Sequence, residues 1–408
     1  MTQRHGARVF ALAALALLVL LTAGCSSEAQ ATPTPTKTPQ AIAVANTPLP
    51  PTLTPTLPPT ATPAPSATPV VTPTATFTPT ATLTPTADPS LLIPARDPSL
   101  SPFTGLRPAD PAVLQRRPVA LKVDNDPAVV PQSGLDKADV VVESPKEGCK
   151  TRFTAVYQSQ DATRVGSIRS ARLIDLELPV IFDAIMAFSG GVQPVRRMLY
   201  DSDIGDHILE QALNGPAFFR DPNIAVPFNL FADTRTLWNV ITKRGWNQAP
   251  KPTAAWAFSE AAPAGGAPAK RVDVPYKDMK VAWTYDPASG RWQRLINGKP
   301  HIDKVSGQQL SAADVVVLAA NNVDTLILEQ GTVMKAGPCS NRSVEIQLWG
   351  EGPLKILRDG KVYEGKWVRP ERHGAFRFVD ASGQDIPLKP GNSWWEIVPM
   401  DMKVAIAQ

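Results

Sequence analysis

Short apolar runs separated by turn residues dominate the chain from about residue 100 onward. In the first part of this region, apolar residues at helical spacing predict helices over 171–182 and 234–243, the second of which stops at Gly245. Strands mixed with helices predict an α/β or α+β domain over 95–260. The predicted strands of this domain are short and bounded by turn residues, and they cover 118–124, 138–143, 153–157 and 184–188.

The pattern becomes strand-rich after an Ala-, Gly- and Pro-rich segment, which we interpret as a linker over 261–271. Turn dipeptides such as Asn297-Gly298 and Asp359-Gly360 separate the later runs at spacings typical of hairpins. We therefore predict a mainly antiparallel β domain over 272–400. Its predicted strands cover 281–285, 315–318, 344–348, 354–357, 366–368, 375–379 and 394–398.

A different composition precedes both domains. Over 25–94, many of the chain's 43 prolines alternate with threonine. Proline removes backbone donors and fixes φ, so neither helix nor sheet is expected there. We predict a disordered, semi-rigid tether that reaches on the order of 200 Å when fully extended at about 3.1 Å per residue. A flexible linker without a length requirement is the alternative, and dense Thr near Pro is compatible with O-glycosylation.

The first 24 residues have the layout of a signal peptide. Arg4 and Arg8 precede an uninterrupted apolar run from Val9 to Leu21, which is short for a membrane span. An uncleaved membrane anchor is the alternative. Cys25 follows Ala-Gly directly, and this segment resembles the bacterial lipobox, although Thr22 departs from the usual Leu. The resemblance implies lipid attachment to Cys25 after export and a final location on the outer face of the cell membrane.

Charge, cysteine content and the absence of common motifs limit the partners, disulfides and cofactors that we expect. Loss of Arg4 and Arg8 with the signal peptide lowers the formal charge from +4 to +2, and a nearly balanced chain argues against a nucleic-acid partner. The remaining cysteines, Cys149 and Cys339, form a disulfide outside the cytoplasm if they lie close enough, and otherwise stay two separate thiols. The chain has no Walker loop, HExxH, GxSxG or CxxC motif, so we expect neither a cofactor nor a metal site of these kinds.

A polar cluster is the best candidate for a site. Its members stand at the ends of the first two predicted strands, at the start of the third and at the start of the first helix. If the strands are parallel, these ends meet at one sheet edge, where ligands bind in open α/β sheets. A Ser cap would leave helix amides aimed at an anion, and guanidinium groups suit carboxylate or phosphate. The candidate ligand-binding residues are Asp124, Asn125, Glu143, Arg152, Arg169, Ser170 and Arg172.

Two other interpretations of this cluster remain open. Arg152 and Glu143 could form a buried structural ion pair, with the other arginines holding loops. Alternatively, Asp124, Asp126 and Glu143 could supply oxygen ligands to a hard cation such as Ca²⁺, although the alternating spacing of a calcium loop is absent.

Five blocks that occur in one order resemble the YerB-type bacterial lipoproteins, a family defined by a domain of unknown function and its C-terminal companion domain. The resemblance implies extracytoplasmic location, lipid attachment, two domains and no established reaction. Cys149 departs from it, because this position is usually Gly, and so does Phe228, which stands where His is expected. The blocks are Arg117-Pro-Val-Ala-Leu-Lys-Val-Asp-Asn125, Pro131-Gln-Ser-Gly134, Ala138-Asp-Val-Val-Val-Glu143, Thr151-Arg-Phe-Thr-Ala-Val-Tyr157 and Val165-Gly-Ser-Ile-Arg-Ser-Ala-Arg172.

These observations together predict a membrane-anchored lipoprotein that binds an anionic or cell-wall-derived ligand, or an envelope protein, at the Arg-rich edge of the first domain. The alternative is a cell-wall-directed hydrolase or transferase that uses Glu143 or Asp124 as its acid/base.

Overall fold

The computed structural model describes residues 96–408 with the exception of 330, 332, 336 and 338. The predicted signal peptide and tether, and with them Cys25, lie outside the described residues. Within the part of the chain that the structure describes, no helix is long and apolar enough to cross a membrane.

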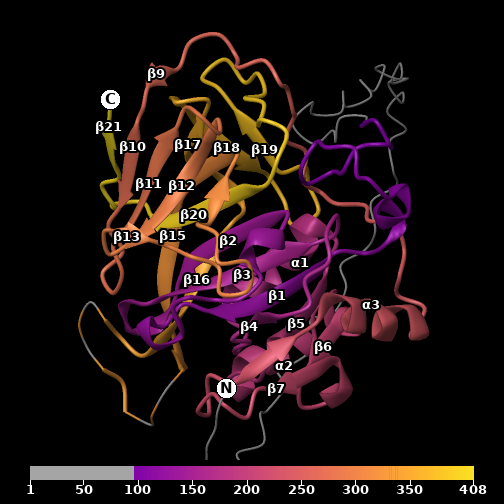
Figure 1. Cartoon of the computed structure of the whole chain (residues 1–408). Helices are drawn as coiled ribbons and strands as arrows, with labels where there is room; N and C mark the ends of the chain where they lie inside the picture. The colour runs from indigo at the N-terminus through magenta and orange to yellow at the C-terminus, as the bar shows by residue number, and fades with distance from the viewer. Residues whose placement is uncertain (1–95, 330, 332, 336, 338) are drawn as a thin grey trace, which may run out of the picture. The chain divides into compact units, whose positions relative to one another are not determined.

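A 12-stranded sheet forms the centre of the fold (Figure 1). Its strands are β1 (Val119–Asp124), β2 (Val140–Pro145), β3 (Thr151–Tyr157), β5 (Ile185–Phe188), β6 (Ile208–Glu210), β9 (Ala267–Pro268), β15 (Asp314–Leu328), β16 (Arg342–Gln347), β17 (Gly350–Arg358), β18 (Lys361–Arg369), β19 (Arg377–Val379) and β20 (Ser393–Pro399). The main path runs β19-β18-β17-β15-β20-β2-β3-β1-β5-β6, while β16 pairs with β15 and β9 with β18.

Strand β20 joins the two halves of the chain within this sheet. It runs parallel to β2, with Trp394 opposite Val141, and parallel to β15, with Trp394 opposite Val315. Strand β2 comes from the N-terminal domain, whereas β15 and β20 come from the C-terminal domain. The two domains therefore share one continuous sheet.

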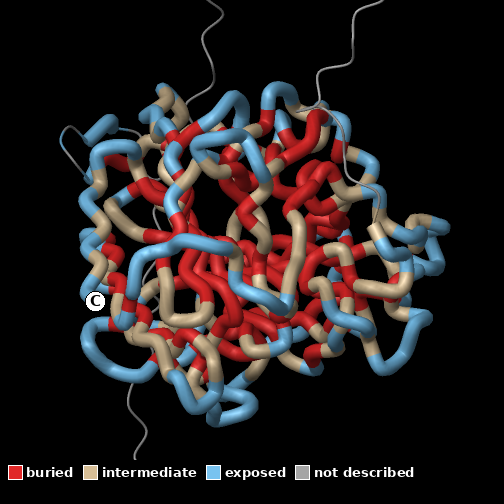
Figure 2. Tube along the Cα trace, turned by 90° about the horizontal axis from the view of Figure 1, so that it is seen from above, coloured by how far each residue is buried: buried red, intermediate tan, exposed pale blue. Residues whose placement is uncertain are grey.

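Both faces of the sheet are covered, which explains why its strands are nearly continuous apolar runs in the sequence. Successive side chains of a strand point to opposite faces, so on β3 Phe153 and Val156 belong to different cores. The first core includes Trp283 and Trp292 of a smaller sheet, and the second includes Trp395 and residues of the first helices. Figure 2 shows these buried residues gathered in the interior, with exposed turns around them.

Two smaller sheets complete the strand content. One is antiparallel, with order β13-β12-β11-β10-β21 and β14 paired to β12, and the other has the order β4-β8-β7. The C-terminal domain is thus mainly antiparallel, and the predicted fold class is confirmed. The strands are β10 (Arg271–Val274), β11 (Val281–Asp286), β12 (Arg291–Ile296), β13 (Lys299–Pro300), β14 (Ser311–Ala312) and β21 (Ala405–Ala407) in the first, and β4 (Val165–Gly166), β7 (Phe218–Arg220) and β8 (Leu230–Ala232) in the second.

Of the two predicted helices, one is confirmed and one is wrong. Helix α3 (Thr234–Lys243) has the predicted bounds and begins after Asp233, whose side chain accepts a hydrogen bond from the Arg235 backbone at 2.8 Å. The helix predicted over 171–182 is instead a 3₁₀ turn, η6 (Leu173–Leu176), followed by α1 (Leu178–Phe182). Pro179 in the first turn of α1 cannot donate to the preceding turn, so it starts a new helix.

Helix α2 (Gln193–Tyr200) was not predicted. Only Val195 and Leu199 of this helix are buried, so its apolar stripe is narrow, and two arginines occupy its middle. A single pair of apolar residues four positions apart gives too weak a periodicity for a prediction.

Candidate functional site

The end of β1 and the start of β3 bring the first group of candidate residues together. Asp124 lies opposite Arg152 in the antiparallel β1–β3 register, so both side chains point to the same face. Arg152 Nη2 lies 3.5 Å from Asp124 Oδ1, and Arg169 Nε lies 2.8 Å from Asp124 Oδ2. The latter contact is an ion pair rather than an aligned hydrogen bond. These side chains thus come together because β1 and β3 are antiparallel neighbours. They do not meet at the shared edge of parallel strands, as expected from the sequence.

The backbone around Ser170 holds this group. The Ser170 carbonyl accepts hydrogen bonds from Arg152 Nη1 at 2.9 Å and from Arg172 Nη1 at 3.4 Å. Ser170 does not cap a helix, which corrects the prediction. The residue before η6 is Arg172, and its backbone N–H donates to Asp175 Oδ2 at 2.7 Å. The Arg172 amide at the start of this turn is therefore satisfied by the chain's own carboxylate.

The side chain of Arg172 is also held by an acidic residue of the chain. Its Nε and Nη2 donate to the two carboxylate oxygens of Glu147 at 2.7 and 2.5 Å. Burial would raise the pKa of Glu147, but the Arg172 guanidinium outweighs it and holds this pKa at about 2. Beside it, burial lowers the pKa of Lys146 to about 8, while Lys146 Nζ lies 3.2 Å from Glu147. Burial likewise lowers the pKa of Arg152 to about 10, with Arg172 adding to the shift.

Glu143 belongs to the opposite face of the sheet. In the β2–β3 register it lies opposite Phe153, one residue after Arg152, so the two side chains point away from each other. The ion pair considered between Arg152 and Glu143 is therefore absent. Glu143 is fully buried and accepts hydrogen bonds from Asn125 Nδ2 at 2.9 Å, from Thr151 Oγ1 at 2.6 Å and from Arg294 Nη2.

The chain's second half supplies site residues that the sequence reasoning missed. Arg294 on β12 is fully buried, and its Nη1 lies 3.8 Å from Glu396 Oε1, which also accepts from Trp283 Nε1 at 2.8 Å. Burial raises the pKa of Glu396 to about 8, and the nearby Glu143 carboxylate adds to the shift. The available signal was the alternation of β12, where Arg294 takes an inward position between Trp292 and Ile296.

Asn125 connects this group to a third segment of the chain. Its Oδ1 accepts from Gln132 Nε2 at 3.0 Å, and Gln132 Oε1 lies 2.6 Å from His301 Nε2. Burial lowers the pKa of His301 well below its usual value, because the charged imidazolium would lose its hydration. His301 therefore stays neutral inside a polar network that spans both domains.

The carboxylates considered as calcium ligands each face a cation instead. Asp126 Oδ2 lies 2.5 Å from Lys150 Nζ, while Asp124 faces Arg169 and Glu143 faces Arg294. Among the residues that the structure describes, no group of three or more His, Cys, Asp or Glu side chains is arranged to hold a metal ion.

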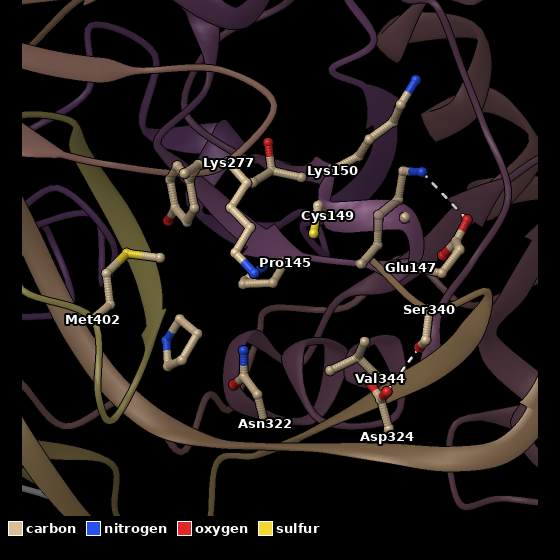
Figure 3. Close-up of a pocket in the computed structure, with 15 residues that line it drawn as sticks. Pro145, Glu147, Cys149, Lys150, Lys277, Asn322, Asp324, Ser340, Val344 and Met402 are labelled. Carbon is tan, nitrogen blue, oxygen red and sulfur yellow. Dashed lines mark hydrogen bonds and ion pairs between the residues drawn. The ribbon is translucent and has the colours of Figure 1, made fainter. Parts of the chain in front are cut away.

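A pocket of about 170 Å³ lies next to these charged residues, and Glu147, the partner of Arg172, is one of the residues that line it (Figure 3). The turn after β2 forms one wall, and Asn322 and Asp324 of β15 form the facing wall. The Lys277 side chain points into the pocket and Asn322 rises towards it from β15, whereas Lys150 points away (Figure 3). The remaining lining residues are Pro145, Lys146, Gly148, Cys149, Thr151, Tyr276, Ser340, Val344, Pro399 and Met402.

A disulfide bond joins Cys149, which lines this pocket, to Cys339. The Gly148 N–H donates to the Ser340 carbonyl at 2.7 Å beside the disulfide. Arg172 adds a further link, because its Nη1 lies 3.5 Å from Glu329, just beyond the end of β15. The β15–β16 arm of the C-terminal domain is thereby attached to the β2–β3 turn of the N-terminal domain.

Comparisons with known proteins agree with this organisation. The family model described as "Protein of unknown function (DUF3048) N-terminal domain" matches residues 103–247. The family model of the DUF3048 C-terminal domain matches residues 272–395. YerB of Bacillus subtilis (strain 168), whose name marks it as a candidate lipoprotein, is 29% identical over 304 residues, which are 73% of this chain and 86% of YerB.

The crystal structure of YerB from Bacillus subtilis matches with a TM-score of 0.64 and 27% identity, and it covers 76% of this chain and 99% of the YerB chain. Sequence and structure thus agree over both domains. The chain therefore belongs to the YerB-type family of bacterial lipoproteins, which is defined by this pair of domains of unknown function.

Proposed function

We propose that this protein is an extracytoplasmic binding module, anchored through a lipid on Cys25, which holds an anionic ligand of the cell envelope in the pocket beside Glu147. The predicted tether over 25–94 would carry the folded domains away from the outer face of the membrane and into the cell wall. A wall fragment or an envelope protein could present the anionic group.

One observation carries this proposal: some charged side chains around the pocket have an ion-pair partner, and one cation does not. Glu147 is held by Arg172, and Lys150 by Asp126. Lys277, by contrast, has no ion-pair partner among the described residues and points into the pocket (Figure 3). The Asp324 carboxylate also lines the pocket without an ion-pair partner among the described residues, but its Oδ2 accepts a hydrogen bond from Ser340 Oγ at 2.7 Å. The Lys277 ammonium is therefore the lining cation that is left for an anion.

The enzymatic alternative finds less support in the same geometry. A general acid or base must come within hydrogen-bond reach of its substrate. The Glu143 side chain is 0% exposed and that of Asp124 is 2% exposed, and arginines bind both. These carboxylates are therefore better suited to holding the fold together than to proton transfer.

Thermal unfolding of the full chain in mild detergent tests the proposal, with soluble anionic cell-wall fragments as probes. Binding to the folded state adds about 2.7 kcal/mol of stability at a hundred times Kd, which raises the midpoint. We expect Lys277→Ala to lose this shift. Lys299→Ala is the matched control, because Lys299 is also exposed, has no ion-pair partner among the described residues and does not line the pocket.

Equal shifts in the two variants would contradict the assignment to this pocket. Mass spectrometry of the fragments after incubation addresses the alternative. Cleaved or modified fragments that form with the wild-type chain and not with Glu143→Gln would establish an enzyme instead.

A further inference from the structure

A second pocket, of about 110 Å³, lies where segments far apart in the sequence meet. Its polar lining consists of Ser133, Ser167 and Lys304. Among the described residues that line it, there is no Asp or Glu. The rest of the lining is apolar or backbone: Ala128, Val129, Val130, Pro131, Gly166, Ile224, Phe228 and Phe231.

Ser167 is the unusual member of this lining. The residue is 3% exposed, and its Oγ has no hydrogen-bond partner among the described residues. Buried hydroxyls are normally paired, because an unpaired one loses its bonds to water without replacement. The Ser167 hydroxyl is therefore a buried donor that is available to a ligand.

Backbone hydrogen bonds hold all three polar residues in place. Ser133 and Gly166 exchange a pair of backbone hydrogen bonds at 3.0 and 3.1 Å. The Ser167 carbonyl accepts from the backbone N–H of Asp124 at 2.9 Å, which ties it to the end of β1. Lys304, from the C-terminal domain, donates its backbone N–H to Gln132 at 2.7 Å, next to Ser133. The site is thus preorganised by both domains.

Two arginines lie beside this pocket and one lysine lines it. The Arg169 guanidinium lies 5.3 Å from the Phe228 ring centroid, and that of Arg164 lies 3.6 Å from the Phe231 centroid. Asp124 pairs with Arg169 and Asp221 with Arg164, so these two charges are largely balanced. Lys304 has no ion-pair partner among the described residues, and it is the charged side chain among the described residues that line the pocket.

We propose that this pocket binds a single tetrahedral oxyanion, either inorganic phosphate or the phosphate group of an ester, through the hydroxyls of Ser133 and Ser167 and the ammonium of Lys304. Hydrogen-bond donors and a cation without a competing carboxylate suit a phosphate, and charge-assisted hydrogen bonds are the strong ones. The volume accommodates one such group. This site is separate from the pocket beside Glu147 and does not depend on it.

Isothermal titration of the full chain in mild detergent with inorganic phosphate tests the site. Ser167→Ala and Lys304→Ala should each weaken binding roughly tenfold or more, as expected for the loss of one hydrogen bond to a charged ligand. Ser382→Ala and Lys299→Ala are the matched controls, because both residues are exposed and lie outside the pocket lining. Vesicles containing phosphatidylglycerol form a second arm, which distinguishes a lipid headgroup from a free phosphate.

Ser167→Ala also gives a second readout, the thermal midpoint, which distinguishes a ligand-binding role of Ser167 from a structural one. Removal of an unpaired buried hydroxyl should leave the thermal midpoint of the ligand-free protein unchanged or raise it, while phosphate affinity falls. Weakened binding of either probe in both variants, with unchanged controls, supports the proposal. Unchanged affinity in Ser167→Ala and Lys304→Ala, or no binding of either probe at millimolar concentration, would overturn it.

Discussion

The guanidinium of Arg294 hydrogen-bonds the carboxylate of Glu143, 151 residues earlier in the chain, and both side chains are fully buried. Arg294 belongs to the smaller antiparallel sheet and Glu143 to the large one, so the pair connects the two domains. Each charge has been withdrawn from water and relies on its partner. The interface between the domains is therefore sensitive to the loss of either residue.

Arg294→Met should lower the free energy of unfolding by about 3–5 kcal/mol, because it leaves the Glu143 carboxylate buried without its cation. Urea unfolding of the wild type and the variant measures this difference. Arg271→Ala is the control: the Arg271 and Asp273 side chains are 40% and 43% exposed, and such a pair contributes only about 0–1 kcal/mol. A loss below about 1 kcal/mol in Arg294→Met would contradict the dependence of Glu143 on Arg294.

The contribution of Glu396 to the free energy of unfolding should fall as pH rises between about 4.5 and 8. Burial, with the neighbouring Glu143 carboxylate adding to it, raises the pKa of Glu396 from its ordinary 4.5 to about 8 in the folded chain. Within this window the folded state keeps a proton that the unfolded state releases, so the free energy of unfolding decreases with pH. Glu396→Gln should remove this pH-dependent contribution, as measured by urea unfolding of both proteins at a series of pH values.

Asp314, whose pKa burial also raises to about 8, is unchanged in that comparison, so the difference between wild type and variant isolates Glu396. Superimposable profiles would show that Glu396 does not titrate in this window.

Reduction of the Cys149–Cys339 disulfide should lower the free energy of unfolding by about 2–5 kcal/mol, because the bond closes a loop with a sequence separation of 190. Urea unfolding with and without reductant measures this. The variant Cys149→Gly/Cys339→Ser should be insensitive to reductant. It should also be more stable, by about 1–2 kcal/mol, than Cys149→Ser/Cys339→Ser, because Cys149 has a φ of 62° that glycine adopts without strain.

Cys25→Ser should release the protein from the membrane, because the predicted lipid would have no thiol to attach to. Fractionation of cells, followed by mass spectrometry of the amino-terminal peptide, checks both the location and the lipid. Ser66→Ala is the control, since it changes one residue of the predicted tether without touching the predicted lipobox. Continued membrane association of Cys25→Ser would point to the uncleaved anchor instead.

The sequence predicted elements where apolar pattern and boundary residues agreed. Helix α3, with Asp233 before it and Gly245 after it, and the strand that contains Phe153 illustrate this. The pairing of strands was beyond such reasoning, because it depends on contacts between β2 and β20 that no local pattern records. The same limit applies to the site. Asp124 and Arg152 were expected to converge, but Arg294 could not be assigned to Glu143 before the sheets were placed.

The position of β20 has a consequence for biogenesis. In chain order it is the last strand of the large sheet, yet it lies between β2 and β15. A ribosome delivers β2 long before β20, so during synthesis β2 presents an open edge, the kind of surface that invites pairing with foreign chains. The shared sheet is complete only when this last strand has been added between β2 and β15. This edge of β2 therefore stays without its partner strand until Ser393–Pro399 has emerged.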